Sequence, residues 1–156
     1  MPILLDYQDT TPRHQLPYLF AAQAQKEVIF NEALGRIDAL LHIAVAGVRP
    51  DIPAAPVEGE CWIVGEGAQG AWSDHVDAIA CYCAGDWTYL APFEGMIAWN
   101  AAQAARMTFR SQWTVPATIA LPSGGATVDE EARQAIADLV NSLTEAGILP
   151  PPPPDP

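Results

Sequence analysis

The fold of this chain is decided by the stretch Ala78-Ile79-Ala80-Cys81-Tyr82-Cys83-Ala84-Gly85-Asp86-Trp87-Thr88-Tyr89-Leu90. Its two outer segments, 78–83 and 87–90, are rich in the apolar and aromatic residues that pack well on a sheet. Between them, Ala84-Gly85-Asp86 has the composition of a tight turn. The stretch therefore predicts a β-hairpin and places a sheet at the centre of the fold.

Further short strands are predicted on both sides of this hairpin. Cys61-Trp62-Ile63-Val64 lies between glycines, and a second hairpin is expected from 96–99 and 107–109 across a connection at 100–105. Tryptophan rings bury a large area per residue, and all five lie in this part of the chain. We expect a small antiparallel β-domain over 59–116 whose core is supplied largely by Trp62, Trp72, Trp87, Trp99 and Trp113.

A long helix is predicted before the β-domain. Between Phe20 and Ala46, apolar residues recur at spacings of four and three, which marks one stripe of a helix. Gly47 follows as a helix stop. Residues 1–19 are predicted to be an irregular arm, and the proline-rich linker 49–58 completes a helix-and-linker segment over 20–58. The predicted stripe consists of Phe30, Leu34, Ile37, Leu41 and Ala44.

A loop and a short C-terminal helix are predicted over 117–149. Thr127-Val128-Asp129-Glu130 fits a capping box with Thr127 as the N-cap, and Gly147 fits the C-terminal stop. A polyproline tail is predicted over 150–156. The chain as a whole is therefore predicted to be α+β. The apolar seam of the last helix is Ala132, Ile136, Leu139 and Leu143.

The charge balance excludes several classes of partner. The chain carries 19 acidic and 7 basic residues, a formal net charge of −12, without a cluster of Lys and Arg. Binding to nucleic acid or to an anionic membrane surface is not expected, because both need clustered positive charge. The N-terminus lacks a signal peptide, and no apolar stretch is long enough to span a membrane. We expect the chain to be made in the cytoplasm.

The three cysteines, Cys61, Cys81 and Cys83, are predicted to be buried and reduced. Their number is odd, and a two-residue offset along one strand rarely gives disulfide geometry. Zinc would need four ligands, and no second pair of cysteines or histidines completes such a set.

The sequence offers little for catalysis. Ser73-Asp74-His75 brings a hydroxyl, a carboxylate and an imidazole together, but a catalytic triad is assembled in space and neighbouring loop residues seldom face one another. Asp74 and Asp77 fall short of the six or more oxygen ligands of a calcium site. We expect a non-enzymatic protein with no catalytic, cofactor or metal residues.

Exposed tryptophans are the basis of an alternative. Aromatic rings on a β-scaffold can stack on the apolar faces of sugars. Trp72, in a loop rich in Gly, Ser and Asp, is the best candidate for exposure, and Trp87 and Trp99 would lie on adjacent strands. The competing hypothesis is that each of these rings is packed in the core and unavailable to a sugar.

Three runs near the N-terminus form a signature: Leu16-Pro17-Tyr18-Leu19, Ala22-Gln23-Ala24-Gln25-Lys26-Glu27-Val28, and Asn31-Glu32-Ala33-Leu34 continued by Arg36-Ile37-Asp38-Ala39-Leu40. Together they resemble the opening of a family of unknown function that occurs in prophages and gene transfer agents of alphaproteobacteria. Gly59–Gly65, Gly85-Asp86-Trp87 and the helix from Asp129 to Ile148 extend this resemblance. It implies a component of a virus-like particle and no catalytic residues.

The expected function is a structural one. The resemblance implies a base or adaptor subunit of a head spike or tail fibre, on the surface of a released particle, with capsid and spike-fibre proteins as partners. We expect a homo-oligomer, a trimer or pentamer. A carbohydrate-binding module for host polysaccharide is the alternative, and a capsule-degrading hydrolase ranks behind both. The expected assembly residues are Phe30, Leu34, Ile37, Leu41, Ile136, Leu139 and Leu143.

Overall fold

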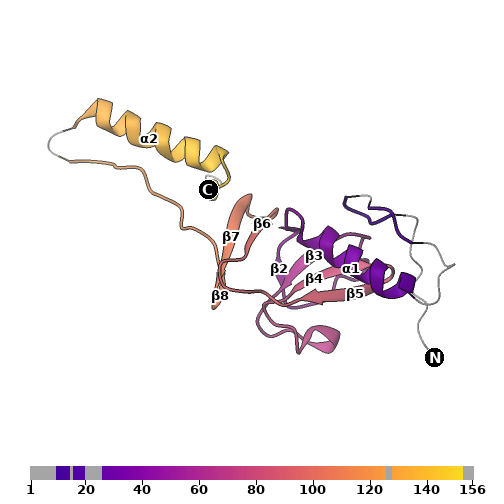
Figure 1. Ribbon diagram of the computed structural model, residues 1–156. Helices are drawn as coiled ribbons and strands as arrows, with labels where there is room; N and C mark the ends of the chain where they lie inside the picture. The colour runs from indigo at the N-terminus through magenta and orange to yellow at the C-terminus, as the bar shows by residue number, and fades with distance from the viewer. Residues whose placement is uncertain (1–9, 15, 20–25, 126–127, 153–156) are drawn as a thin grey trace.

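The computed structural model describes residues 10–14, 16–19, 26–125 and 128–152 (Figure 1). Within these residues the fold is α+β, as predicted, with a helix near each end and eight strands in two four-stranded sheets between them. Neither helix of the described residues has the length and apolar character that a membrane span needs.

The first sheet has the strand order β2-β3-β4-β5, formed by Val48–Arg49, Cys61–Val64, Ile79–Cys83 and Asp86–Leu90. The predicted central hairpin is confirmed, since β4 and β5 pair antiparallel with Ile79 opposite Leu90. Ala84 and Gly85 both have positive φ, 55° and 81°, which is the backbone of a two-residue hairpin loop.

The second sheet has the order β1-β6-β7-β8, formed by Ala44–Val45, Ile97–Asn100, Ala105–Arg110 and Gln112–Thr114. The second predicted hairpin is confirmed as β6 and β7, and the buried Asn100 side chain closes its turn through hydrogen bonds with Gln103. The antiparallel prediction needs one correction, because β1 pairs with β6 and β2 with β3 in parallel.

The prediction of a long N-terminal helix is wrong. α1 spans Lys26–Leu40, only 15 residues, and the chain passes through His42 with φ 51° directly into β1. Val45, placed by the predicted helix near its end, is buried where β1 pairs with β6. Pairing with a strand more than 50 residues away therefore overrides the local helical periodicity. The predicted start at Phe20 lies outside the described residues.

The main core lies between the sheets and beneath α1. It is built from aliphatic, methionine and cysteine side chains and contains no fully buried tryptophan: Ala39, Val45, Cys61, Ile63, Ile79, Cys81, Leu90, Met96 and Met107. Of the five tryptophans, only Trp72 is fully buried, in a second cluster with Val64 and Ala80 on the other face of the first sheet. The expectation that tryptophans supply most of the core is thus wrong.

The expectation of three reduced cysteines is also wrong. Cys61 and Cys81 stand opposite each other in the register of β3 and β4 and form a disulfide. Both are buried, as predicted, and Cys83 is a half-buried free thiol. The pair is invisible in the sequence because its members are 20 residues apart and meet only through strand pairing.

Candidate functional site

The side of α1 that packs against the first sheet consists of polar and small residues. Asn31 and Asp38 are only 3% and 2% exposed, and Ala39 is buried beside them. At Gly35 the helix passes close to β4, since a Cβ there would lie 3.9 Å from Cys83 Sγ. α1 is therefore packed through residues that amphipathic patterning would assign to solvent.

Asp38 is buried because it holds an N-terminal loop against the helix. Its carboxylate accepts hydrogen bonds from Thr11 Oγ1 at 2.7 Å and from the backbone N–H groups of Arg13 and His14 at 3.0 and 2.6 Å. Three donors satisfy a carboxylate that burial would otherwise penalise.

Arg13 in turn satisfies the end of α1. Its guanidinium donates to the carbonyl oxygens of Asp38, Ala39 and His42, at 3.4, 2.8 and 3.1 Å. The last carbonyls of a helix have no partner within the helix and form the negative end of its dipole. A single arginine therefore ends the helix at the point where the chain turns into β1.

Asn31 fixes a second N-terminal segment in the same way. Its side-chain oxygen accepts from the Leu19 N–H at 2.9 Å, and its amide nitrogen donates to the Leu19 carbonyl at 3.1 Å. The sequence pattern did not predict that Asn31 and Asp38 hold the N-terminal segments against α1. Their separation of seven residues, which is two helical turns, placed both on one face and was the available signal.

The apolar residues of α1 point away from the sheets. Phe30, Ile37 and Leu41, three of the predicted assembly residues, are 49%, 47% and 43% exposed, and Leu34 is half-buried. Ile29 and Leu40 extend this surface on the same side of the helix. We call the set the α1 face: Ile29, Phe30, Ile37, Leu40 and Leu41. A contiguous apolar surface of this kind is a feature of interaction sites.

The chain after β8 forms a projecting arm, residues 115–149 (Figure 1). An extended segment, 115–125, leads away from the sheets, and α2 (Glu130–Glu145) runs back. Asp129 is the N-cap of α2 and accepts from Ala132 N at 2.9 Å. The predicted N-cap, Thr127, lies outside the described residues, and the cap is two residues later than predicted.

The arm returns to the second sheet at Gly147. This residue has φ 67° and a backbone carbonyl that accepts from Arg106 N at 3.1 Å, and a Cβ on it would overlap the Trp99 ring. Ile148 N donates back to Leu143 O at 2.9 Å, so Gly147 ends the helix as predicted. Leu149 is buried at this junction. The arm is thus attached at both of its ends, to β8 and to the β6–β7 edge.

No residue of α2 is buried, so the helix lacks a covering layer. The half-buried residues are Arg133, Ala137, Val140, Leu143 and Thr144, and this side is turned toward the extended segment, where Arg133 reaches the carbonyls of Pro122 and Gly124. The predicted assembly residues Ile136 and Leu139 are 42% and 59% exposed, and Ile119 and Leu121 of the extended segment are 50% and 51% exposed. We call these four residues, Ile119, Leu121, Ile136 and Leu139, the arm face.

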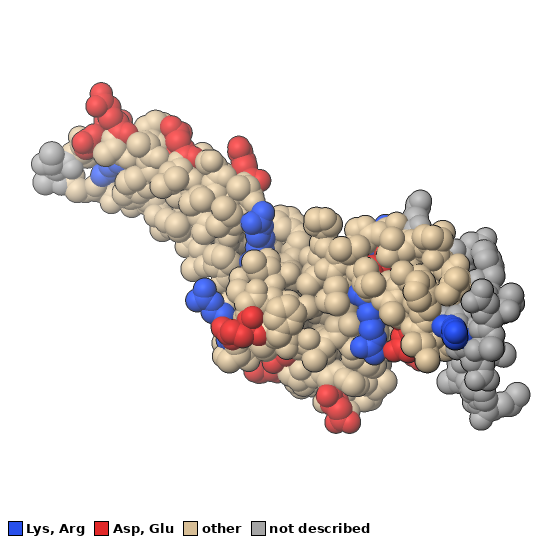
Figure 2. All heavy atoms as spheres, viewed as in Figure 1, with Lys and Arg blue, Asp and Glu red and all other residues tan. Residues whose placement is uncertain are grey.

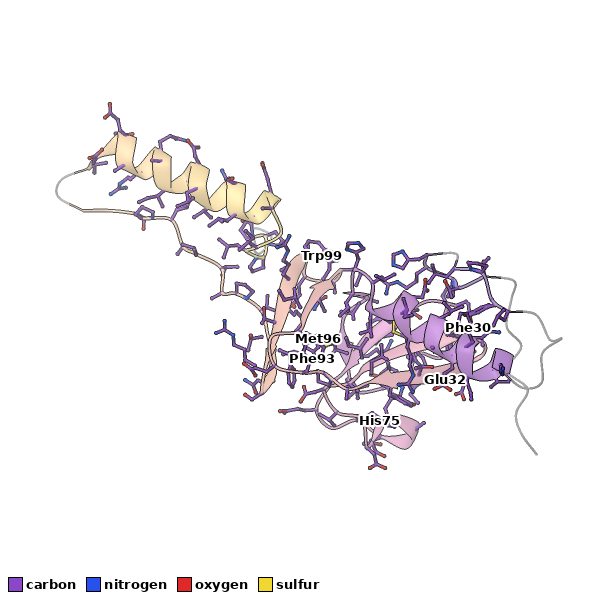
Figure 3. The ribbon with its side chains drawn as sticks, viewed as in Figure 1. Phe30, Glu32, His75, Phe93, Met96 and Trp99 are labelled. Atoms are coloured by element: carbon purple, nitrogen blue, oxygen red, sulfur yellow. A yellow bond between two sulfur atoms is a disulfide. The ribbon has the colours of Figure 1, made fainter. Side chains whose placement is uncertain are left out.

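The predicted sugar-binding tryptophans do not form one exposed surface. Trp72, in the 3-10 turn η1 (Gly70–Trp72), is fully buried and packs edge-on against Trp87 at 5.1 Å between ring centroids. Trp87 is half-buried on β5 in the first sheet, whereas Trp99 is on β6 in the second, beside the end of α2 (Figure 3). The expected exposure of Trp72 and the expected adjacent strands are therefore both wrong, because the loop of Trp72 folds onto the sheet.

The remaining candidates for chemistry are engaged structurally. His75 stacks on Tyr89 at 3.6 Å between ring centroids, and Ser73 Oγ donates to Gly70 O at 3.0 Å. The Ser73–His75 run is thus not arranged as a triad. Within the described ranges, no three His, Cys, Asp or Glu side chains gather as a metal site, around Asp74 and Asp77 or elsewhere.

A pocket of about 170 Å³ lies between α1 and the β4–β5 hairpin. Cys83 lines it, and burial raises the pKa of its thiol; the carboxylates of Glu58 and Asp38 act in the same direction and Tyr18, 3.6 Å away, acts against it. A protonated thiol is a poor nucleophile. The polar lining is Asn31, Glu32, Asp86 and Thr88.

Residues 30–114 match a family described as a protein of unknown function, DUF2793. The chain belongs to the DUF2793 family. No curated protein matches it. The expectation of a family of unknown function is confirmed at that level, and the first two runs of the N-terminal signature lie before the matched residues.

The DUF2793 segment has a structural meaning in this fold. It begins at Phe30, in the first half of α1, and ends at Thr114, the last residue of β8. Both sheets and most of α1 lie inside it, as do the anchors Asn31 and Asp38. The arm face lies outside it, so the two apolar faces belong to different parts of the chain.

Proposed function

We propose that this DUF2793 protein is a structural subunit of a phage-like particle, a base or adaptor for a head spike or tail fibre. The observation that carries the proposal is the pair of uncovered apolar surfaces, the α1 face and the arm face. Among the described residues many large apolar side chains are exposed, and those of α1 and of the arm make two separate outer surfaces, which suits assembly. The particle context is supported by the resemblance of the Leu16–Leu40 signature to proteins of prophages and gene transfer agents.

In this role the chain is a homo-oligomer, and its neighbours are capsid and spike-fibre proteins at the surface of the released particle. The body, which is α1 with the two sheets, is stiffened by the Cys61–Cys81 disulfide and by the buried anchors of α1. A rigid body suits an adaptor that holds other proteins in fixed positions.

The test is to find the chain on particles. An antibody against it should label purified particles from the producing cells at one type of position, a head vertex or the tail, in electron micrographs. Serum absorbed with the purified protein is the control. Particles that carry no label and no peptide of this chain in mass spectrometry, from cells that make the chain, would refute the proposal.

Carbohydrate binding is the second candidate, and the pocket beneath α1 is the observation that favours it. Asp86 and Glu32 supply carboxylates beside the Thr88 hydroxyl and Trp87, a combination that can hydrogen-bond and stack on a sugar. Binding of surface polysaccharide that disappears in Asp86→Ala and persists in Asp74→Ala would support it. Equal binding by both variants would remove the pocket from consideration.

A further inference from the structure

We propose that the arm face of one copy docks on the α1 face of the next, so that the subunits assemble head to tail. This deepens the structural role proposed above and rests on it. Each copy then uses its arm face in one contact and its α1 face in another. Repetition of this contact gives a closed ring if the rotation between copies closes, and a filament if it does not.

The two surfaces match in form. The α1 face runs from Ile29 to Leu41, about 18 Å along its helix, and the seam of α2 runs from Ala132 to Leu143, about 17 Å, with Ile136 and Leu139 as its exposed large side chains. Among the described residues none covers these strips, because the buried residues of α1 and the half-buried residues of α2 lie on the neighbouring strip of each helix. Two such strips can pack as an ordinary helix pair.

Charge decides which surfaces pair. The arm, 115–149, carries five acidic residues and one basic residue, whereas residues 10–50 around α1 carry four basic and three acidic residues. One of those three carboxylates, Asp38, is already buried in hydrogen bonds. Arm against arm would bring two negative surfaces together, whereas arm against α1 brings a negative surface to a segment with one more basic than acidic residue, in which Arg36 is paired with Glu32 and Lys26 is exposed.

The surface view shows how the charge of the arm is arranged. The acidic side chains lie along one edge of the arm, and mainly uncharged surface with a few basic side chains lies between that edge and the body (Figure 2). Lys26 and Arg36 lie on α1 beside its apolar face, and both are exposed. The apolar strips can therefore meet with acidic and basic side chains at their rims, which is the arrangement of specific interfaces.

The arm cannot reach the α1 face of its own chain in this fold. It projects from the β6–β8 side of the body, while Phe30 lies on α1 at the opposite side (Figures 1 and 3). Its attachment at both ends, through β8 and through Gly147, holds it there. The partner of the arm face is thus on another copy.

A mixing experiment tests the direction of assembly. One variant, Ile37→Ser/Leu41→Ser, removes the α1 face, and the other, Ile136→Ser/Leu139→Ser, removes the arm face. Gln112→Ser on β8 and Asn141→Ser on α2 place the same residue at exposed, uncharged polar positions outside both faces and serve as controls. Circular dichroism confirms folding, and light scattering after size exclusion gives the mass.

Head-to-tail assembly predicts that the wild type and both controls form oligomers, that each double variant alone is a monomer, and that an equal mixture forms a dimer of the two. One intact arm face and one intact α1 face remain in that mixture. A double variant that still self-associates would show a like-with-like contact and overturn the proposal. A monomeric wild type at its highest soluble concentration, or a mixture without the dimer, would overturn it as well.

The outcome is separable from the particle role. Oligomers that obey the mixing rule, together with particles that lack the chain, would leave the head-to-tail contact standing and remove the proposed function. Labelled particles together with a failed mixing test would support the proposed function and refute the head-to-tail contact.

Discussion

Phe30 and Asn31 are neighbours in α1 and occupy each other's expected environment: the phenyl ring is 49% exposed, while the amide is 3% exposed and bonded twice to Leu19. Neighbouring residues on a helix point about 100° apart. When the helix packs through Asn31, the side chain of Phe30 therefore points away from the packed side. The buried strip of the helix thus stabilises the fold, while the strip proposed for assembly is a different one.

Asn31→Leu is expected to destabilise the fold although it adds an apolar side chain at a buried position. It leaves the N–H and carbonyl of Leu19 without their partner, which costs about 1–3 kcal/mol. Phe30→Ser, one residue away on the exposed strip, should change the free energy of unfolding by no more than about 0.5 kcal/mol. Urea denaturation of the two variants checks this, and a Phe30→Ser variant less stable than Asn31→Leu would contradict it.

Loss of the disulfide should destabilise the chain. The Cys61–Cys81 bridge closes a loop of 20 residues, and bridges of that span contribute about 3 kcal/mol. Denaturation of Cys61→Ala/Cys81→Ala under non-reducing conditions measures the loss, with Cys83→Ala as the control that keeps the bridge. Equal stability of the double variant and wild type would show that the bridge is absent in solution.

The free thiol should titrate at unusually high pH. Burial raises the pKa of Cys83, so its alkylation by iodoacetamide in the folded chain should begin at a higher pH than in the urea-unfolded chain. Because the folded thiol holds its proton more tightly, the contribution of Cys83 to stability is fully present below the unfolded pKa. That contribution is lost as pH rises through the folded value. Superimposed pH profiles of the folded and unfolded chains would refute the shift.

Gly147→Ala should release the arm from the body. Gly147 and Gly124 both have positive φ, 67° and 76°, so alanine is strained by about 1–2 kcal/mol at either site. Only at Gly147 does the added methyl also overlap a neighbour, the Trp99 ring. Limited proteolysis within 115–125 and Trp fluorescence should respond to Gly147→Ala far more than to Gly124→Ala. Equal responses would mean that the contact with Trp99 does not hold the arm.

The strands were predictable from local signals. Ile79–Cys83 and Asp86–Leu90 are joined by two residues with positive φ, and such a loop is readable in the sequence as Ala84-Gly85 between apolar runs. β1 and β2 were not predictable in this way, because Ala44–Val45 and Val48–Arg49 become strands only through parallel pairing with β6 and β3. The same pairing shortened the predicted helix.

The stripes predicted to carry assembly were identified by their periodicity alone. Periodicity identifies an apolar stripe on a helix, but it does not say whether the stripe faces the core or the outside. Ile37 is exposed because Asn31 and Asp38, on another side of the helix, are buried through hydrogen bonds to the N-terminal segments. The burial of Trp72 was missed because the composition of a loop does not reveal that the loop folds back onto a sheet.

The DUF2793 match ends at Thr114, so the arm lies outside the matched segment. The arm begins after β8 and is attached again where Gly147 contacts Trp99 of β6 and accepts a backbone hydrogen bond from Arg106 of β7. A different segment between these two points would leave both sheets intact. Chains that share this body and differ in the arm would then sort into separate assemblies within one cell, each recognising only the acceptor helix that suits its own arm.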